Sequence, residues 1–215
     1  MTAGGGVTVR RVGEAALLLE VADQERVAAL YARLLAERAD GTLGDLAEIV
    51  PAARTVLLDG VADPAALAGR LSGWIVTGSG PVEGPLVELP TVYDGPDLAE
   101  VAELWGVGTE EAVRRHSGIE YRVAFCGFAP GFGYLTGLPA ELAVPRRATP
   151  RAAVPAGSVA VAGGYSAVYP GPSPGGWQLL GRTAVRLWDT GREPAALLAP
   201  GTRVRFVPVK GHEHA

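Results

Sequence analysis

Residues 152–181 read AAVPAGSVAVAGGYSAVYPGPSPGGWQLLG and contain no charged residue. This span is long enough to cross a bilayer, but eleven of its thirty residues are Gly or Pro, which suit β-turns and interrupt helices. Short β-branched and aromatic runs separate the turns, as they do in β-strands. The segment therefore predicts short strands joined by tight turns, and no transmembrane helix.

The same pattern extends from Tyr121 to Val209, where β-branched and aromatic residues lie between Gly/Pro turns. An all-β barrel is the natural arrangement for so many short strands, because closure leaves no exposed edge strand. Two short helices are expected just before this region, over residues 96–104 and 109–116. Thr109 is the expected cap of the second helix. We therefore predict a β-barrel unit over residues 85–212.

The sequence before the barrel alternates strand and helix signals. The expected elements, in chain order, are strands at Val7–Val12 and Ala15–Val21, a helix from Gln24 to Arg38 capped by Asp23, strands at Leu46–Val50 and Thr55–Leu58, and a helix from Asp63-Pro64 to about Trp74. This order predicts an α+β sandwich of the ferredoxin type over residues 1–80. The stretch TGSGPVEGP at 77–85 resists both helix and strand, so we place the domain boundary there.

Size and composition narrow the class of protein. A chain of 215 residues with 48% apolar and 20% charged residues describes a globular protein with room for two domains. The net charge of −4 and the pI near 5.4 argue against general nucleic-acid binding. Cys126 is the only cysteine and residues 1–11 lack an apolar signal core, so we expect a cytoplasmic protein without disulfides.

Residue counts also exclude several kinds of enzyme. Lys210 is the only lysine, so the chain lacks the lysine of a P-loop, a biotin carrier, a Ser-Ser-Lys amidase or a Schiff-base enzyme. Residues 131–137 fail the dinucleotide fingerprint by one spacing. With one cysteine, and with His212 and His214 in an expected tail, we predict no zinc site. The sequence thus indicates no metal and no cofactor bound by this chain.

One charge pattern favours an anion site. Residues 142–188 hold no Asp or Glu but five arginines, namely Arg146, Arg147, Arg151, Arg182 and Arg186. Arginine forks match carboxylate and phosphate oxygens two at a time. Arg147 and Arg151 have the best claim, because prolines at 145 and 150 stiffen their backbone and lower the entropy lost on binding. The alternative is that this segment is a solvated face, with Arg186 only facing solvent.

Other candidate residues have two interpretations each. His116 ends an expected helix, where it can act as a proton shuttle or simply be favoured by the helix dipole. Cys126 has no obvious base nearby, which fits a buried strand residue better than a nucleophile. Four aromatic residues either line a pocket or fill the barrel: Tyr134, Tyr165, Tyr169 and Trp177.

Several motifs in fixed order resemble those of a known family. The main ones are YRVAFCGFAPGFGYLTGLP at 121–139, PRRATPR at 145–151, VPAGS at 154–158 and SPGGWQLLGRT at 173–183. Further matches are GEAAL at 13–17, VPAAR at 50–54, GPDL at 95–98, His116 and PGTRVRFVP at 200–208. With these motifs the chain closely resembles, over nearly its full length, the carboxyltransferase-domain subunit 1 family, whose members are called KipI, PxpB (a 5-oxoprolinase subunit) or allophanate hydrolase subunit 1.

The resemblance implies a ferredoxin-like N-terminal domain followed by a cyclophilin-like β-barrel. It implies a cytoplasmic heteromer, with a homologous carboxyltransferase subunit 2 (KipA- or PxpC-like) and a PxpA-like subunit as partners. In bacteria such a complex resembles an ATP-dependent 5-oxoprolinase, a hydrolase that opens the lactam of pyroglutamate to glutamate. The chain is then expected to be inactive alone, to bind a small anionic amide, and to leave the use of ATP to the complex.

The site expected from this resemblance centres on the arginine segment. We expect Arg147 and Arg151 to hold the substrate carboxylate or a phosphorylated intermediate, with His116 as the third catalytic residue. Backbone amides near Gly163 and Gly164 are expected to stabilise a developing oxyanion. The expected substrate-binding residues are Phe132, Tyr134, Arg146, Ser158, Gly163, Gly164, Tyr165, Tyr169, Ser173, Trp177, Gln178 and Arg182.

One departure from the family pattern bears on the substrate. Family members typically read GNQTGIYP where this chain has GGYSAVYP at residues 163–170. An amide side chain can hold a lactam by paired hydrogen bonds, and Tyr165 cannot do the same. Substrate identity therefore stays open among 5-oxoproline, allophanate and other amides. Two alternative functions also stay open: a KipI-type inhibitor of a histidine kinase, and a subunit of a urea or allophanate carboxyltransferase-hydrolase system that needs a biotin carrier on another chain.

Overall fold

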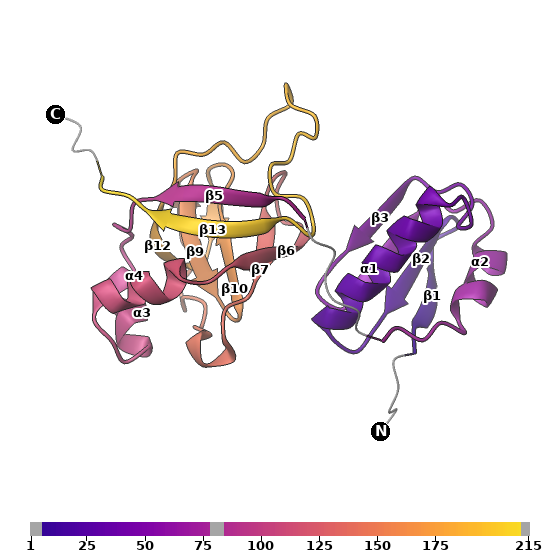
Figure 1. Ribbon diagram of the computed structural model, residues 1–215, viewed down its shortest axis with the longest axis horizontal. Helices are drawn as coiled ribbons and strands as arrows, with labels where there is room; N and C mark the ends of the chain where they lie inside the picture. The colour runs from indigo at the N-terminus through magenta and orange to yellow at the C-terminus, as the bar shows by residue number, and fades with distance from the viewer. Residues whose placement is uncertain (1–5, 78–83, 212–215) are drawn as a thin grey trace. The chain divides into compact units, whose positions relative to one another are not determined.

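The computed structural model describes residues 6–77 and 84–211 (Figure 1). The chain forms two compact units, Met1–Glu83 and Gly84–Ala215. The division falls inside the TGSGPVEGP stretch at 77–85. Most of that stretch, residues 78–83, and the tail histidines His212 and His214 lie outside the described residues.

The first unit is a four-stranded antiparallel sheet with two helices. Its elements are β1 (Thr8–Val12), β2 (Ala16–Glu20), α1 (Gln24–Ala39), β3 (Glu48–Pro51), β4 (Thr55–Asp59) and α2 (Pro64–Leu71). The strands lie in the order β1-β2-β4-β3, with α1 lying across the sheet (Figure 1). Alternate residues of β2, Leu17 and Leu19, are buried in one core with Leu30 and Leu34 of α1, because strand and helix spacing each turn them to one side.

Local sequence signals fix where the helices of the first unit begin. Asp23 precedes α1, and its carboxylate accepts the backbone N–H of Arg26 at 2.9 Å. Asp63 caps α2 in the same way, with Pro64 in the first turn, where its missing N–H costs nothing.

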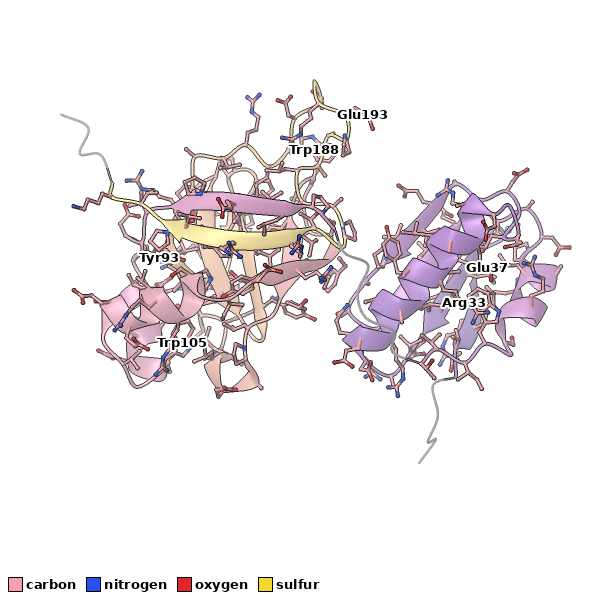
Figure 2. All side chains as sticks on the ribbon, viewed as in Figure 1. Arg33, Glu37, Tyr93, Trp105, Trp188 and Glu193 are labelled. Atoms are coloured by element: carbon pink, nitrogen blue, oxygen red, sulfur yellow. The ribbon has the colours of Figure 1, made fainter. Side chains whose placement is uncertain are left out.

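The prediction that α2 runs to Trp74 is wrong. The helix ends at Leu71, where Ser72 and Gly73, both weak helix formers, follow. The Trp74 ring instead lies under the guanidinium of Arg33, 3.5 Å from its Cζ (Figure 2 labels Arg33). The observed unit is an α+β layer of sheet and helices, and its ferredoxin-type assignment stays a prediction.

The second unit is built on a seven-stranded sheet. Its elements are β5 (Leu86–Thr91), α3 (Leu98–Leu104), α4 (Thr109–Ser117), β6 (Tyr121–Cys126), β7 (Gly133–Thr136), the 3-10 turn η1 (Ala140–Leu142), β8 (Arg151–Val154), β9 (Ser158–Ala162), β10 (Tyr165–Val168), β11 (Ser173–Gly175), β12 (Gln178–Arg182) and β13 (Arg203–Pro208). The sheet order is β12-β9-β10-β7-β6-β13-β5, with β13 and β5 parallel. β8 and β11 form a separate two-stranded ribbon.

The sheet curls until its two outer strands, β12 and β5, come together. Just beyond β5, Val92 pairs with Arg182 at the end of β12 through backbone hydrogen bonds of 2.9 and 2.8 Å. Gly181 permits this approach, because a Cβ there would overlap the Val92 carbonyl. The result is a nearly closed β-barrel, and the prediction of a barrel in this region is confirmed.

The two helices expected before the barrel are present, with different starts. α3 begins at Leu98, two residues after the expected Pro96. The prediction that Thr109 caps α4 is wrong: Gly108 occupies the cap position, and Thr109 is the first helical residue. Helix α3 packs on β12 and α4 on β13 (Figure 1).

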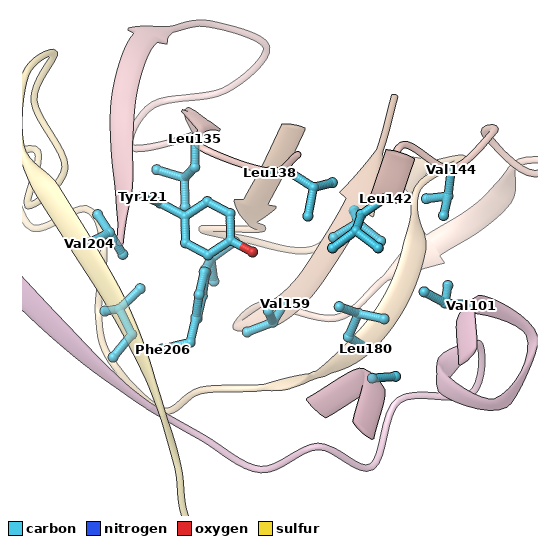
Figure 3. Close-up of a cluster of buried hydrophobic side chains, with 14 of the residues drawn as sticks. Val101, Tyr121, Leu135, Leu138, Leu142, Val144, Val159, Leu180, Val204 and Phe206 are labelled. Atoms are coloured by element: carbon cyan, nitrogen blue, oxygen red, sulfur yellow. The ribbon is translucent and has the colours of Figure 1, made fainter. Parts of the chain in front are cut away.

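The barrel sheet buries side chains on both of its faces. The first core (Figure 3) contains Leu89, Val101, Tyr121, Val123, Leu135, Val159, Val161, Leu180, Val204 and Phe206. The second core contains Phe132, Val154, Ala160, Ala162, Ala167, Tyr169, Trp177 and Leu179. Residues of β9 alternate between the two, so this strand is buried throughout and carries no charge. Within the described ranges, no helix is both long and apolar enough to cross a membrane.

A β-bulge turns the end of β6 toward the second core. Val123 pairs with Leu135, but the register then shifts so that Phe125 pairs with Tyr134. Strict alternation would put Val123 and Phe125 on the same face. The extra residue instead leaves Val123 in the first core and stacks Phe125 on Tyr134, with ring centroids 4.4 Å apart.

Candidate functional site

Seven aromatic side chains form an aromatic cluster at the second core: Phe125, Phe128, Phe132, Tyr134, Tyr165, Tyr169 and Trp177. Phe132 lies at its centre, with its ring centroid 5.1–5.6 Å from those of four edge-on neighbours, Phe128, Tyr134, Tyr169 and Trp177. Tyr165 joins through Tyr134 at 5.8 Å. The structure thus brings together all the aromatic residues expected at the site.

Phe128 belongs to this cluster although it was not among the expected site residues. Its side chain is 58% exposed, and its φ of 70° is the only positive value of a non-glycine residue in the described part of the chain. A bulky residue held in this left-handed region costs about 1–2 kcal/mol. Strain together with an exposed aromatic ring is a feature of ligand-contacting loops.

Tyr169 lies against the turn Gly175-Gly176-Trp177. A Cβ at Gly175 would overlap the Tyr169 hydroxyl, so only glycine fits there. Burial raises the pKa of Tyr169, while a backbone hydrogen bond from Trp177 and the charges of Arg146 and Arg151 act in the lowering direction. The phenol therefore stays protonated at neutral pH.

Arg147 and Arg151 converge on one buried carboxylate. Nη1 of Arg147 and Nη2 of Arg151 lie 2.8 and 2.6 Å from Oδ1 of Asp97. Oδ2 of Asp97 accepts the backbone N–H of Leu179 at 2.7 Å. The Asp97 side chain is 3% exposed, against 31% for Arg147 and 22% for Arg151. Two cations therefore share one buried anion, which fixes both guanidinium groups in place.

This pairing corrects the expectation that both guanidinium groups are free to hold a substrate. Residues 142–188 contain no acid, but the fold supplies carboxylates from outside the segment. The Val92–Arg182 bridge lays residues 94–97 along β12. Arg182 then lies 2.9 Å from Asp94, and Arg186 lies 3.4 Å from Asp189. Both of these pairs are exposed, and such pairs contribute little to stability.

The network around Asp97 is incompletely satisfied. Among the described residues, no hydrogen-bond partner is found for three buried polar atoms of expected site residues: Arg147 Nε, Ser173 Oγ and Gln178 Oε1. Gln178 Nε2 lies 3.4 Å from Oε1 of Glu100, and the other carboxylate oxygen of Glu100 lies 4.0 Å from Nη1 of Arg147. An unsatisfied buried polar atom costs about 1–3 kcal/mol. Such atoms mark places where a bound molecule can complete the hydrogen bonding.

His116 lies in the barrel's first core, with its side chain fully buried. Nδ1 is 2.8 Å from the Tyr93 hydroxyl and Nε2 is 2.9 Å from Ser166 Oγ (Figure 2 labels Tyr93). Ser166 donates to the carbonyl of Ala160 at 3.2 Å, so it accepts from Nε2–H, and Nδ1 accepts from Tyr93. Burial lowers the pKa of His116 to about 3. These facts favour the structural interpretation of His116 over a proton shuttle.

Other expected site residues are already engaged. The N–H of Gly163 donates to the Val144 carbonyl at 2.7 Å, so it is not available as the oxyanion donor that we expected. Gly164 is exposed. The Ser158 hydroxyl donates to the carbonyl of Pro155 at 2.8 Å. Burial raises the pKa of Cys126 to about 11, which suits a structural thiol.

Asp97 is the site residue that sequence reasoning missed. It lies 50 and 54 residues before its two arginine partners, beyond the reach of any local pattern. One signal was present, since Asp97 belongs to the GPDL motif at 95–98. In the structure Asp97 makes no side-chain cap for α3.

The structure thus combines a four-stranded α+β unit with a nearly closed β-barrel that carries the arginine–carboxylate group. The chain belongs to the family described as carboxyltransferase domain, subdomain C and D, whose model matches residues 7–198. It is 40% identical to the B subunit of 5-oxoprolinase from Escherichia coli O157:H7 over 213 residues, 93% of this chain and 94% of that protein.

Solved structures agree with this assignment. TTHA0988 superposes with a TM-score of 0.76 at 35% identity, over 94% of this chain and 41% of that one. The chain thus spans about two fifths of the length of TTHA0988. The K. lactis urea amidolyase matches with a TM-score of 0.70 at 18% identity, over 96% of this chain and 15% of that one. At that identity the likeness shows a shared fold only.

Proposed function

We propose that this chain is the PxpB-type subunit of an ATP-dependent 5-oxoprolinase, a multi-subunit hydrolase that opens the lactam of 5-oxoproline (pyroglutamate) to glutamate. The observation that carries the proposal is the 40% identity to the E. coli 5-oxoprolinase protein over nearly the whole length of both chains. In the reaction the ring C–N bond breaks. Water adds a hydroxyl to the carbonyl carbon and a proton to the nitrogen, and ATP hydrolysis drives the step.

Within the complex, this chain binds the substrate, and other subunits bind and hydrolyse ATP. The only lysine is Lys210, and the sequence has no phosphate-binding loop. The proposed partners are a homologous carboxyltransferase subunit 2 (KipA- or PxpC-like) and a PxpA-like subunit. The proposal includes ferredoxin-like and cyclophilin-like domains for the two units.

The chemistry of 5-oxoproline fits the second face of the barrel. The substrate is a small five-membered lactam that carries one carboxylate. The aromatic cluster offers apolar ring faces and edges, and the arginines beside Tyr169 offer positive charge. A protonated Tyr169 and the incompletely bonded Gln178 and Ser173 add polar atoms.

The test is reconstitution of the complex from this chain and the partner subunits of the same genome. We expect 5-oxoproline-dependent release of ADP with the full set, and none when this chain is omitted. Urea and allophanate in place of 5-oxoproline should not support turnover. Turnover that continues undiminished without this chain would exclude it from the enzyme.

A further inference from the structure

Four of the five arginines in residues 142–188 already have carboxylate partners. Asp97 holds Arg147 and Arg151, and the other two pair with Asp94 and Asp189. Arg146 differs from them. It is exposed, and over residues 6–77 and 84–211 neither a hydrogen bond nor an ion pair of its side chain is found. Its five N–H donors are therefore available to an anion from outside the chain.

The backbone places Arg146 beside the aromatic cluster. The N–H of the next residue, Arg147, donates to the carbonyl of Gly176 at 2.8 Å, so this step of the chain runs along the Gly175–Trp177 turn. Arg151 is the β-ladder partner of Gly175, and its Nη1 lies only 3.5 Å from the Trp177 carbonyl. The backbone next to Arg146 and the side chain of Arg151 thus meet the same turn.

The charges of both arginines also reach Tyr169. Arg146 and Arg151 both act on the Tyr169 hydroxyl, which lies against that turn. Arg151 is fixed through Nη2 by Asp97 and makes only the long contact of its Nη1 with Trp177. It therefore keeps N–H groups for a second contact. One free and one fixed guanidinium group beside the turn that holds Tyr169 and Trp177 form a site for a small carboxylate.

We propose that Arg146 is the specificity-determining residue that binds the carboxylate of the substrate, with the remaining N–H groups of Arg151 as its second contact. Asp97 acts as a positioning residue, because it holds Arg151 and Arg147 without touching the substrate. The identity of the ligand as 5-oxoproline rests on the proposed function. The anion site itself rests on the geometry.

The kinetic test uses Arg146→Ala, Arg146→Lys and Arg186→Ala in the reconstituted complex. Arg146→Ala should raise KM for 5-oxoproline about ten- to a hundredfold and change kcat little, as expected for losing a charge-assisted, two-point contact. Arg146→Lys keeps the charge but not the fork, so a smaller rise is expected. Arg186→Ala is the matched control, since it removes an arginine of the same segment that pairs with Asp189. An unchanged KM in Arg146→Ala would overturn the proposal.

An uncharged lactam separates carboxylate binding from general damage. 2-Pyrrolidinone has the lactam ring without the carboxylate, so its inhibition constant should be equal in the wild type and in Arg146→Ala. If Arg146→Ala weakens both compounds equally, the residue acts on structure, and the assignment is overturned.

Direct binding distinguishes failure of this inference from failure of the proposed function. The indole N–H signal of Trp177 is followed by NMR while the chain alone is titrated with acetate and with 5-oxoproline. Both anions should shift the signal in the wild type and in Arg186→Ala, but not in Arg146→Ala. If the complex does not turn over 5-oxoproline yet this pattern is seen, the proposed function fails and the anion site stands. Shifts retained in Arg146→Ala, or absent from the wild type, overturn the anion site.

Discussion

Two buried polar networks of the barrel unit differ in how completely they are satisfied. In the Tyr93–His116–Ser166 network both ring nitrogens and the serine hydroxyl have partners. Tyr93 donates to His116, His116 donates to Ser166, and Ser166 donates to the carbonyl of Ala160. In the Asp97 network the carboxylate is bonded on both oxygens, but Arg147 Nε and Gln178 Oε1 find no partner among the described residues. The first network is neutral and closed, which suits a group that holds the barrel together. The second is charged and incomplete, which suits a group that organises a binding site.

Removal of the Asp97 carboxylate should have the largest effect on stability. Asp97→Ala leaves two partly buried guanidinium groups and the Leu179 N–H without their shared acceptor. We expect a loss of about 3–5 kcal/mol in the free energy of unfolding, measured by urea denaturation at neutral pH. Asp94→Ala is the matched control, because its arginine pair is exposed and should contribute at most about 1 kcal/mol. Similar losses in both variants would show that burial does not distinguish the two pairs.

The pH dependence of stability tests the neutral network. The pKa of His116 is lowered from 6.5 to about 3. Between these two pH values, His116 is therefore protonated in the unfolded chain and neutral in the folded chain. Stability from this group is complete above about pH 6.5 and falls by about 1.4 kcal/mol per unit of pH below it, until the folded pKa is reached. At about pH 5 the wild type should have lost about 2 kcal/mol by this route.

His116→Gln is the comparison for that measurement, because glutamine keeps a donor and an acceptor but does not titrate. Urea unfolding of both proteins at about pH 7.5 and about pH 5 should show a loss in the wild type that the variant lacks. Equal pH dependence in the two proteins would mean that His116 is protonated in the fold, and the network would not be neutral.

A smaller effect on stability is expected where Tyr169 of the aromatic cluster packs against the Gly175–Trp177 turn. Gly175→Ala places a Cβ against the Tyr169 hydroxyl and should cost about 1–3 kcal/mol through local overpacking. Gly171→Ala, in the preceding turn, meets no atom within 4 Å and should change stability by less than about 0.5 kcal/mol. The contrast is measured by thermal unfolding of the two variants, and equal midpoints would contradict the packing argument.

Local chemistry made much of the fold predictable. Asp23 and Asp63 each fix a helix start, because a side chain two or three residues before an unpaired N–H can reach it. The uncharged stretch that contains β9 already indicated short strands joined by turns, and the structure shows that β9 is buried throughout. The start of α4 was misassigned by one residue, since Gly108 and Thr109 are both acceptable caps in sequence and only the backbone dihedrals decide between them.

The site was harder to predict, because its contacts join distant parts of the chain. The bulge in β6 moves Phe125 to the opposite face of the sheet from Val123, and no residue type at that point predicts a bulge. The burial of His116 depends on the packing of α4 on β13, which places Phe206 against the ring, and on the approach of Ser166 from β10. Five arginines in a segment that itself contains no acid indicated free positive charge, and the structure leaves only Arg146 in that state among them.

The amino-acid sequence alone determined the family, the order of strands and helices in the first unit, and the region where positive charge gathers. These depend on residue types within a few positions of one another, through capping, alternation and turn formation. Only the tertiary structure decided which arginines are neutralised and which histidine atoms are occupied. Barrel closure between Val92 and Arg182 brings Asp94 and Asp97 to residues some 50 or more positions later, and Coulomb energy depends on distance in space and on burial, not on separation along the chain.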